Sequence, residues 1–321
     1  MGYNTLMSKL VIIDGNAILH RAFHALPPLT TKRGEPINAV YGLVSMILRV
    51  ITDLKPTHIA VTFDERAPTF RQKELPTYQA QRPPMAEDLG SQFSKAREFL
   101  AAASIPVYSK PGFEADDVIG TIATRAQSLE PSKKTKLQAL TPNLSEVIIV
   151  TGDRDQLQLV DDKKSIKLYM PVVGLANAKL YGEKETVERM GVPPTQIVDL
   201  KALTGDASDN YFGVSGIGPK TATTLLSKYK SVKEIYEHLN EIPSNVREKL
   251  EKGKKSANQS CFLATIVRDV PLDLDFEAMG KWNLSGPEVI NLFEEFGFKT
   301  LTKRIQEVGK KLDEEKQGAL F

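Results

Sequence analysis

Three apolar runs in this chain end at an aspartate, and this pattern limits the possible fold more than any other feature. The runs are "KLVIID", "THIAVTFD" and "EVIIVTGD", which end at Asp14, Asp64 and Asp153. Short apolar runs of this kind predict buried strands, and the amphipathic segments between them predict helices. Strands that alternate with helices form a mainly parallel sheet with helices on both faces. Because ligands of such sheets bind beyond the carboxyl ends of the strands, the three aspartates should meet at one edge.

Six further acids lie where the same edge would be. The stretch "GFEADDVIG" crowds three of them onto the start of a helix, and the others lie in "TGDRD" and "LTGDASDN". One or two acids at a helix N-terminus are stabilised by about 0.3–1 kcal/mol each, but three repel one another. Carboxylates in this number indicate a hard-metal site for two Mg²⁺ or Mn²⁺ ions. The predicted metal ligands are Asp14, Asp64, Glu114, Asp116, Asp117, Asp153, Asp155, Asp206 and Asp209.

The stretch "GVSGIGPKTATTLLSKY" at 213–229 predicts a helix–hairpin–helix that binds DNA phosphates. It is not a P-loop, because Pro219 separates Gly218 from Lys220. Gly216 and Gly218 allow the backbone to approach a phosphate, and the N-terminus of the next helix, with Lys220 and Thr221, faces the anion. Such contacts hold DNA without reading its sequence. A plain connection between two helices is the alternative.

Residues 65–85, "ERAPTFRQKELPTYQAQRPPM", are polar, basic and punctuated by proline. Arg71, Lys73 and Arg82 alternate with the aromatic residues Phe70 and Tyr78. Basic groups beside aromatic rings suit a single-stranded nucleic acid, since bases can stack on the rings. A surface loop without this role is the alternative.

The composition is that of a globular chain, with 321 residues, 41% hydrophobic residues and a net charge of +2. A single cysteine, Cys261, excludes an internal disulfide, and there is no cysteine–histidine zinc pattern. Signal peptide and membrane-spanning patterns are lacking, which predicts a cytoplasmic protein without a membrane partner. The change from alternating strands to mostly helices predicts two domains, at 1–194 and 195–321.

Several long motifs, in order, resemble the 5′-nuclease domain of bacterial DNA polymerase I, which belongs to the flap endonuclease family. They include "FRQKELPTYQAQRPPM", "GFEADDVIGT", "TGDRDQLQLV" and "ALTGDASDNYFGVSGIGPKTA". The resemblance covers residues 9–308 and implies a PIN-like domain, a helical arch at 65–85 and a helix–hairpin–helix (H3TH) domain with bound K⁺. It also implies a bacterial, nucleoid-associated monomer that is a stand-alone nuclease or a fragment. The implied activity is two-metal hydrolysis at flaps, nicks or RNA primers that carry a 5′ single strand.

The resemblance also implies roles for single residues. Asp14, Asp64, Glu114, Asp116 and Asp117 would hold the first metal, and Asp153, Asp155, Asp206 and Asp209 the second. Tyr78 would stack on a base near the scissile phosphate, and Arg71 and Arg82 would steer the 5′ strand. Arg21 and His24 lie in a matching segment near the site. At the end of the chain, Gln317, Leu320 and Phe321 resemble a peptide that binds the sliding clamp; a tail without a partner is the alternative.

Three departures from the family pattern bear on function. Gln79 stands where the family usually has a lysine, "SDNYFG" has Tyr211 and Phe212 in place of Ile-Pro, and residues 129–145 are longer than the usual link. The alternative functions are therefore a DNA-junction binding protein with weak or lost catalysis, and a PIN-type ribonuclease of RNA decay. The hairpin and the arch favour DNA junctions over the ribonuclease.

Overall fold

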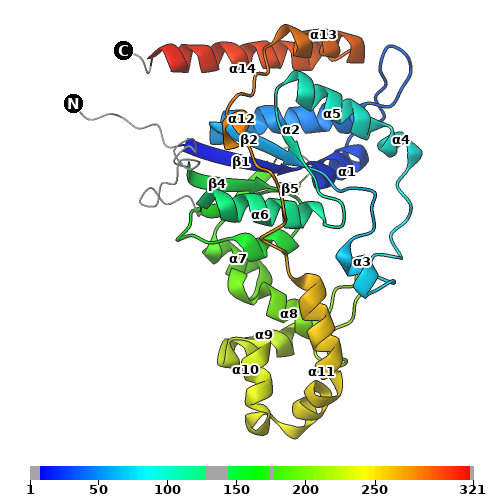
Figure 1. Ribbon diagram of the computed structural model, residues 1–321, viewed down its shortest axis with the longest axis vertical. Helices are drawn as coiled ribbons and strands as arrows, with labels where there is room; N and C mark the ends of the chain where they lie inside the picture. The colour runs from blue at the N-terminus through cyan, green and yellow to red at the C-terminus, as the bar shows by residue number, and fades with distance from the viewer. Residues whose placement is uncertain (1–7, 128–143, 174–176, 319–321) are drawn as a thin grey trace, which may run out of the picture.

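A six-stranded sheet forms the centre of one part of the molecule (Figure 1). The computed structural model describes residues 8–127, 144–173 and 177–318. The strand order is β3-β2-β1-β4-β5-β6, and all neighbours are parallel except β5 and β6. The mainly parallel α/β architecture that the sequence predicts is therefore confirmed. The strands are β1 (Ser8–Asp14), β2 (His58–Thr62), β3 (Val107–Tyr108), β4 (Leu144–Val150), β5 (Ile166–Val173) and β6 (Asn177–Tyr181).

Helices cover both faces of the sheet because successive residues of a strand point to opposite faces. Leu10 and Ile12 of β1 pack in one core cluster with residues of α6, and Val11 and Ile13 pack in a second cluster on the other face. All four side chains are fully buried. Residues of α1, α2 and α5 belong to the second cluster. The helices concerned are α6 (Ala115–Gln127) on one face and α1 (Gly15–Ala25), α2 (Asn38–Leu54) and α5 (Gln92–Ala102) on the other.

The last two helices, α13 (Pro287–Phe296) and α14 (Lys299–Gly318), lie over α2 and α5 (Figure 1). Phe293, Phe296 and Leu301 are buried in the same core cluster as residues of α2 and α5. The range 195–321, which the sequence suggests as the second domain, thus contains helices that pack on the first. These helices are α12 (Phe276–Met279), α13 (Pro287–Phe296) and α14 (Lys299–Gly318).

A helical part extends away from the sheet, and in it α8 (Ile197–Thr204) and α9 (Pro219–Tyr229) are joined by a connection that contains the predicted hairpin. A Cβ on Gly213 would lie 2.3 Å from the carbonyl oxygen of Leu203, so only glycine fits at the start of this hairpin. Gly216 has a φ of +77°, which favours glycine as well. The elements are α7 (Glu183–Met190), η3 (Pro194–Gln196), α8 (Ile197–Thr204), α9 (Pro219–Tyr229), α10 (Val232–Glu237), η4 (Leu239–Glu241) and α11 (Ser244–Ala264). The helical fold that the sequence predicts for this part is confirmed, and the domain boundary at 194 and 195 stays a prediction.

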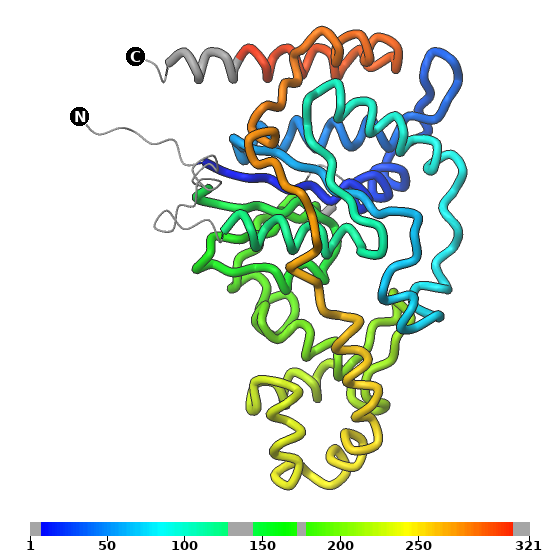
Figure 2. Tube along the Cα trace, in the orientation of Figure 1, coloured from blue at the N-terminus to red at the C-terminus, as the bar shows by residue number. Residues whose placement is uncertain are grey.

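The predicted arch at 65–85 contains one short helix, α3 (Phe70–Glu74), and α4 (Glu87–Gly90) follows it. Figure 2 shows the chain leaving β2, running down to the end of α11 and returning toward α5. Thr69 begins α3 with a capping box, in which its side chain and that of Gln72 bond to each other's backbone N–H.

Two predicted features fall on residues outside the described ranges. Most of the insertion at 129–145 lies there, as do Leu320, Phe321 and the side chain of Gln317 of the clamp-binding peptide. Within the described ranges, none of the helices has the length and apolar character needed to cross a membrane.

Candidate active site

The carboxyl ends of β1, β2 and β4 meet at a cleft of about 530 Å³. Two acids reach this cleft from the start of α6, and three follow the ends of strands. The structure thus brings together five of the nine acids that the sequence predicts. These five form the first carboxylate group: Asp14, Asp64, Glu114, Asp116 and Asp153.

Hydrogen bonds from neighbouring elements fix the acids at the strand ends. Asp14 is the N-cap of α1, and its Oδ2 accepts a hydrogen bond of 2.8 Å from the Thr151 hydroxyl at the end of β4. Asp64 accepts a hydrogen bond of 2.7 Å from the backbone N–H of Ala115, the first residue of α6. Each carboxylate is therefore held by an element other than its own strand, which aligns β1, β2, β4 and α6 at one point.

Burial makes the ionised form of these carboxylates unfavourable. It raises the pKa of Asp14 to about 7, that of Glu114 to about 7, and that of Asp116 well above the usual range. The charge of Asp153 raises the pKa of Asp14 and Asp116 further. A divalent cation among them would favour ionisation of all these groups. Carboxylate oxygens are the ligands that Mg²⁺ and Mn²⁺ prefer, so the residues present fit such an ion.

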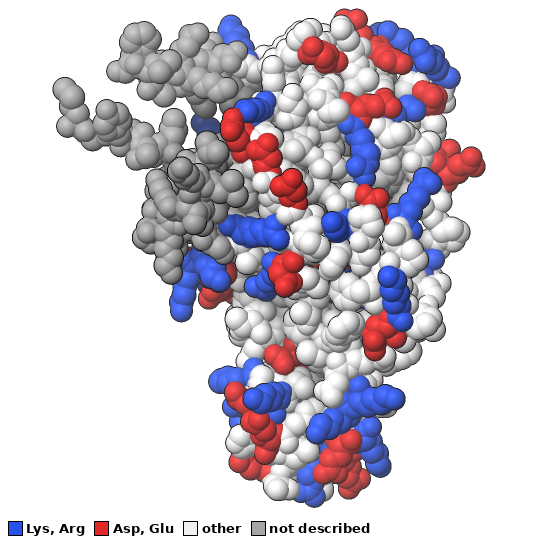
Figure 3. All heavy atoms as spheres, in the orientation of Figure 1, with Lys and Arg blue, Asp and Glu red and all other residues white. Residues whose placement is uncertain are grey.

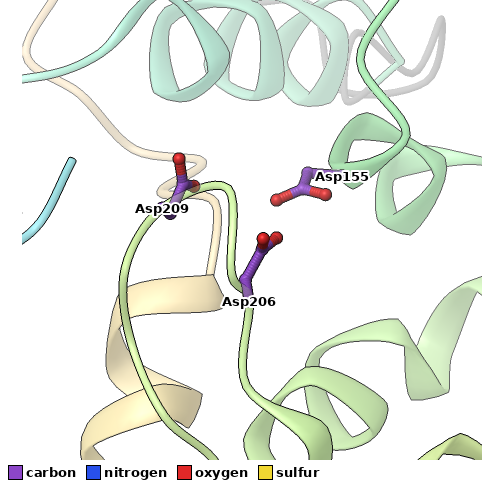
Figure 4. Close-up of side chains that lie close together, drawn as sticks. All are labelled: Asp155, Asp206 and Asp209. Carbon is purple, nitrogen blue, oxygen red and sulfur yellow. The ribbon is translucent and has the colours of Figure 1, made fainter. Parts of the chain in front are cut away.

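Three further acids form the second carboxylate group: Asp155, Asp206 and Asp209. One oxygen of each lies within 4.8 Å of the others. Asp155 begins the 3₁₀-helix η2 (Asp155–Leu159), and the other two lie in the loop after α8. Figure 4 shows the carboxylates of Asp155 and Asp206 pointing toward one another. The loop from the helical part therefore completes a cluster that begins at the sheet.

Lys201 of α8 contacts both Asp155 and Asp206 through its ammonium group. Burial would lower the pKa of Lys201, but the two carboxylates raise it above the ordinary value. Burial raises the pKa of Asp155 to about 6 against the opposing effect of Lys201. Burial would also raise the pKa of Asp206, yet Lys201 and Ser208 lower it overall. A protein cation thus neutralises part of the second carboxylate group.

Asp153 links the two carboxylate groups. The sequence places it with the second metal, whereas in the structure it lines the cleft with the first group. Its Oδ1 accepts a hydrogen bond of 2.8 Å from the backbone N–H of Asp155. Its charge raises the pKa of Asp155 as well as those of Asp14 and Asp116. Asp153 therefore lies close to both groups.

Asp117 does not line the cleft, although the sequence predicts it as a metal ligand. Its side chain is fully buried and forms two hydrogen bonds of 2.8 Å with the guanidinium of Arg71. Its oxygens also accept the backbone N–H groups of Glu114 and Val267. Both carboxylate oxygens of Asp117 are therefore engaged within the protein.

Arg71 is placed differently from the expectation that it steers a DNA strand. It is only 2% exposed, and besides Asp117 it bonds Glu114 at 3.2 Å. It also donates to the carbonyl oxygens of Leu263 and Thr265 at 2.8 and 2.7 Å. These contacts join α3, the start of α6 and the end of α11. Arg71 is therefore buried where the sheet part meets the helical part, and its hydrogen bonds link the two.

Tyr78 is also buried, with 4% of its surface exposed. Its ring stacks on Tyr211, with centroids 6.3 Å apart and an angle of 17° between planes. Its hydroxyl donates to Glu114 and Asp209, both at 3.3 Å. Gln79 Nε2 donates to Asp209 at 3.1 Å, and Arg82 forms an ion pair with the same acid. Stacking of Tyr78 on a base, as the sequence predicts, requires that the ring leave Tyr211.

The remaining predicted DNA-binding residues are spread over three elements. At the hairpin, Gly216, Gly218 and Lys220 are exposed and Thr221 is partly exposed, and Lys249 donates to the Gly216 carbonyl at 3.3 Å. A Cβ on Gly218 would meet nothing within 4 Å, so the backbone there is open to a ligand. Elsewhere, Lys73 on α3 is exposed, and the partly exposed Arg21 of α1 passes close to Gly152, beside Asp153.

Four residues at the site were not predicted from the sequence. Lys201 and Thr151 contact the acids directly, and Asn16 donates to Asp64 at 2.6 Å. Gln156 donates through Nε2 to Asp116 at 2.7 Å and to Asp14 at 3.3 Å. Asn16, Thr151 and Gln156 each lie within two residues of a predicted acid, and this proximity in sequence was an available signal. Lys201 has no such signal, because α8 meets η2 only in the folded chain.

Comparison with known families gives two matches that together cover most of the chain. The model of the 5′-3′ exonuclease N-terminal resolvase-like domain matches residues 9–191. The model of the 5′-3′ exonuclease C-terminal SAM fold matches residues 192–286.

Among curated proteins, the chain resembles DNA polymerase I of Caldicellulosiruptor bescii, with 42% identity over 297 residues that cover 92% of this chain and 33% of that protein. DNA polymerase I of Bacillus subtilis is 36% identical over 304 residues, which cover 94% of this chain and 33% of that protein. The chain thus spans about a third of the length of these relatives.

Two solved structures share the fold at low sequence identity. T5 D15 protein, co-crystallised with metal ions, has a TM-score of 0.63 at 19% identity, over 94% of this chain and 98% of that one. The catalytic core of Rad2 in complex with a DNA substrate has a TM-score of 0.56 at 14% identity, over 95% of this chain and 92% of that one.

Proposed function

The chain belongs to the 5′-3′ exonuclease family, and on this premise we propose that it is a structure-specific 5′ nuclease. Its proposed substrates are branched or nicked DNAs with a 5′ single strand, such as flaps or RNA primers. The observation that carries the proposal is the convergence of two carboxylate groups, with five and three acids, at the edge where the sheet meets the helical part. Carboxylates in this number are typical of metal-dependent phosphodiester hydrolysis.

We propose that the acids hold two divalent cations, Mg²⁺ or Mn²⁺. When bound, such ions activate a water molecule and stabilise the leaving oxygen of an in-line displacement. Asp153 lies near both carboxylate groups and contributes to either ion. The proposed ligands of the first ion are Asp14, Asp64, Glu114 and Asp116, and those of the second are Asp155, Asp206 and Asp209. Asp117 acts indirectly, since with Arg71 it fixes the start of α6 and so orients Glu114 and Asp116.

The hairpin is the proposed site for the duplex part of the DNA. Gly216 and Gly218 expose backbone next to the start of α9, where free N–H groups and Lys220 favour a phosphate. Basic and acidic side chains are interspersed over the face shown in Figure 3, so binding depends on local contacts of this kind. A K⁺ ion held at the hairpin is part of the proposal.

Arg82 and Gln79 line the cleft and are proposed to meet the 5′ strand. Arg82 pairs with Asp209 in this structure, so a phosphate that enters the cleft would compete with that acid for the guanidinium. Without Arg82, Asp209 would keep only the neutral donors Tyr78 and Gln79, and its negative charge would be free to attract a cation. Substrate entry and completion of the second carboxylate group are thereby coupled.

Cleavage of labelled substrates tests the proposal. We expect flap and nicked duplexes to be cut near the junction in Mg²⁺, and no product in EDTA. A single strand without a duplex should be cut more slowly, because the hairpin has no duplex to hold. Tight flap binding with no product in Mg²⁺ or Mn²⁺ would instead support the DNA-junction binding protein.

The partners beyond DNA are separate proposals. Gln317, Leu320 and Phe321 would dock on a sliding clamp, and the chain would act as a monomer at the bacterial nucleoid. Calorimetry with a purified clamp, comparing the full chain with one that ends at Lys316, tests the peptide. Equal heats for both chains would rule the peptide out.

A further inference from the structure

Gln156 is a fully buried amide that lies between two acids of the first carboxylate group. Its Nε2 donates to Asp116 Oδ1 at 2.7 Å and to Asp14 Oδ2 at 3.3 Å. One amide nitrogen thus bridges an acid at the end of β1 and an acid of α6. The neighbouring residue in sequence, Asp155, belongs to the second carboxylate group, so consecutive residues of η2 serve the two groups.

The other end of this amide is unusual. Gln156 Oε1 is buried and lacks a hydrogen-bond partner among the described residues. Buried polar atoms are nearly always paired, and an exception needs an explanation. Gln158, on the same 3₁₀-helix, shows the ordinary case: its Nε2 donates to two carbonyl oxygens, and its Oε1 accepts the N–H of Ile266 at 3.1 Å.

We propose that Gln156 is an additional ligand-bearing residue of the first carboxylate group, which presents Oε1 to a divalent cation held by Asp14 and Asp116. This inference rests on the proposed function, since it concerns the same metal site. An amide oxygen is a hard, neutral donor that suits Mg²⁺ or Mn²⁺. It adds a ligand without adding a further negative charge to a group of five acids.

The structure shows the amide in one orientation, and the proposal requires a second one, in which Oε1 faces the acids. Toward carboxylates, the –NH₂ end is favourable because it donates to both. Toward a cation held by the same carboxylates, the –NH₂ end would be unfavourable and the oxygen favourable. The terminal torsion of glutamine is broad and roughly two-fold, so turning the amide over meets little resistance from the side chain itself. Gln156 would thus satisfy the acids in one orientation and coordinate the ion in the other.

Metal binding by the full-length chain tests this role without reference to cleavage. Mg²⁺ affinity would be measured by calorimetry, and Mn²⁺ affinity by the spin-resonance signal of the free ion. We expect Gln156→Met, which removes both donor and acceptor, to lower the affinity about 10-fold or more. Gln156→Glu, which keeps an oxygen at this position, should bind at least as tightly as the original chain. Equal affinities of the Met variant and the original chain, or a Glu variant as weak as the Met variant, would overturn the proposal.

Two controls keep the outcome interpretable. Gln158→Met makes the same change on the same helix but breaks hydrogen bonds to backbone groups alone, one of them the carbonyl oxygen of Asp155, so it should lower metal affinity far less than Gln156→Met. Asp116→Ala should reduce metal binding in any case. If the original chain binds neither ion, with or without flap DNA, the proposed function is wrong. If it binds an ion with an affinity that the Gln156 substitutions do not change, only the role of Gln156 as a ligand is wrong.

A measurement on the original chain does not depend on the metal affinity of any variant. The side-chain ¹³Cδ and ¹⁵Nε2 resonances of Gln156, assigned by their loss in Gln156→Met, would be followed during a Mg²⁺ titration. Coordination through Oε1 should shift both resonances as the ion saturates the protein, while those of Gln158 stay in place. Gln156 resonances that do not move at saturation would contradict the proposal.

Discussion

Replacing Arg71 by methionine should destabilise the protein strongly and leave the DNA affinity of the folded chain unchanged. The guanidinium is 2% exposed, its partner Asp117 is 0% exposed, and two hydrogen bonds of 2.8 Å join them. Removing one partner of a buried ion pair leaves an uncompensated charge, which costs about 3–5 kcal/mol. Methionine fills much of the volume of the arginine stem, so the loss should come mainly from the charge and from two unpaired carbonyl oxygens.

Urea unfolding followed by circular dichroism measures this loss. With a slope of about 2–3 kcal/mol per molar urea, the midpoint should fall by about 1–2.5 M. The double variant Arg71→Met/Asp117→Leu should recover part of the stability, because it removes both charges together. Lys73→Met on the same short helix is the matched control. Its side chain is exposed, so its unfolding free energy should change by no more than about 0.5 kcal/mol.

DNA binding separates this account from a direct role of Arg71 in steering the strand. A phosphate contact contributes about 0.9 to the slope of log affinity against log salt on duplex DNA, or about 0.7 on a single strand. Arg71→Met should keep the slope of the original chain, measured by fluorescence anisotropy under conditions where the variant is folded. A stable variant with a reduced slope would refute the reasoning.

Three further outcomes follow from the site. Gln79→Lys should raise the single-turnover cleavage rate at saturating enzyme with little change in binding, because it adds a cation beside the cleft; an unchanged or lower rate would show that another cation fills this role. Lys220→Ala should weaken binding to flaps of different sequence equally and reduce the salt slope by about 0.9, as a phosphate contact does; a loss that depends on base sequence would contradict the hairpin assignment. In EDTA, the free energy of unfolding, measured with urea, should fall as the pH rises from about 4 to about 7. The pKa values of Asp14 and Glu114 are raised in the folded state, so the folded chain holds protons that the unfolded chain releases over this range. Stability that rises over this range would contradict the burial of these acids.

The sheet and the positions of most acids at its edge could be predicted from the sequence, because both follow from local patterns. Apolar runs identify β1, β2 and β4, and an aspartate directly after such a run has to lie at the carboxyl edge of a parallel sheet. The hairpin was equally readable, since glycine and proline positions define it locally. These parts of the fold need no knowledge of distant partners.

The contacts that the sequence did not predict join residues far apart in the chain. The sequence does not distinguish Asp117 from the other acids of the cluster. In the structure, both of its oxygens accept hydrogen bonds from Arg71, which is 46 positions away in sequence. The stack of Tyr78 on Tyr211 and the ion pairs of Lys201 likewise depend on how the helical part docks on the sheet. This docking decides which charged groups are buried together. No local sequence pattern predicts the docking.

The most direct test of the central claim is cleavage and binding of one 5′-labelled flap by the original chain and by Asp116→Ala. Asp116 lies in the first carboxylate group and bonds Gln156, whereas the predicted phosphate contacts lie at the hairpin. We predict that Mg²⁺-dependent cleavage by the variant falls below detection while its affinity for the flap is kept or increased, because one negative charge facing the DNA is removed. Cleavage by the variant at the original rate would contradict the assignment of these carboxylates to a metal-dependent nuclease site.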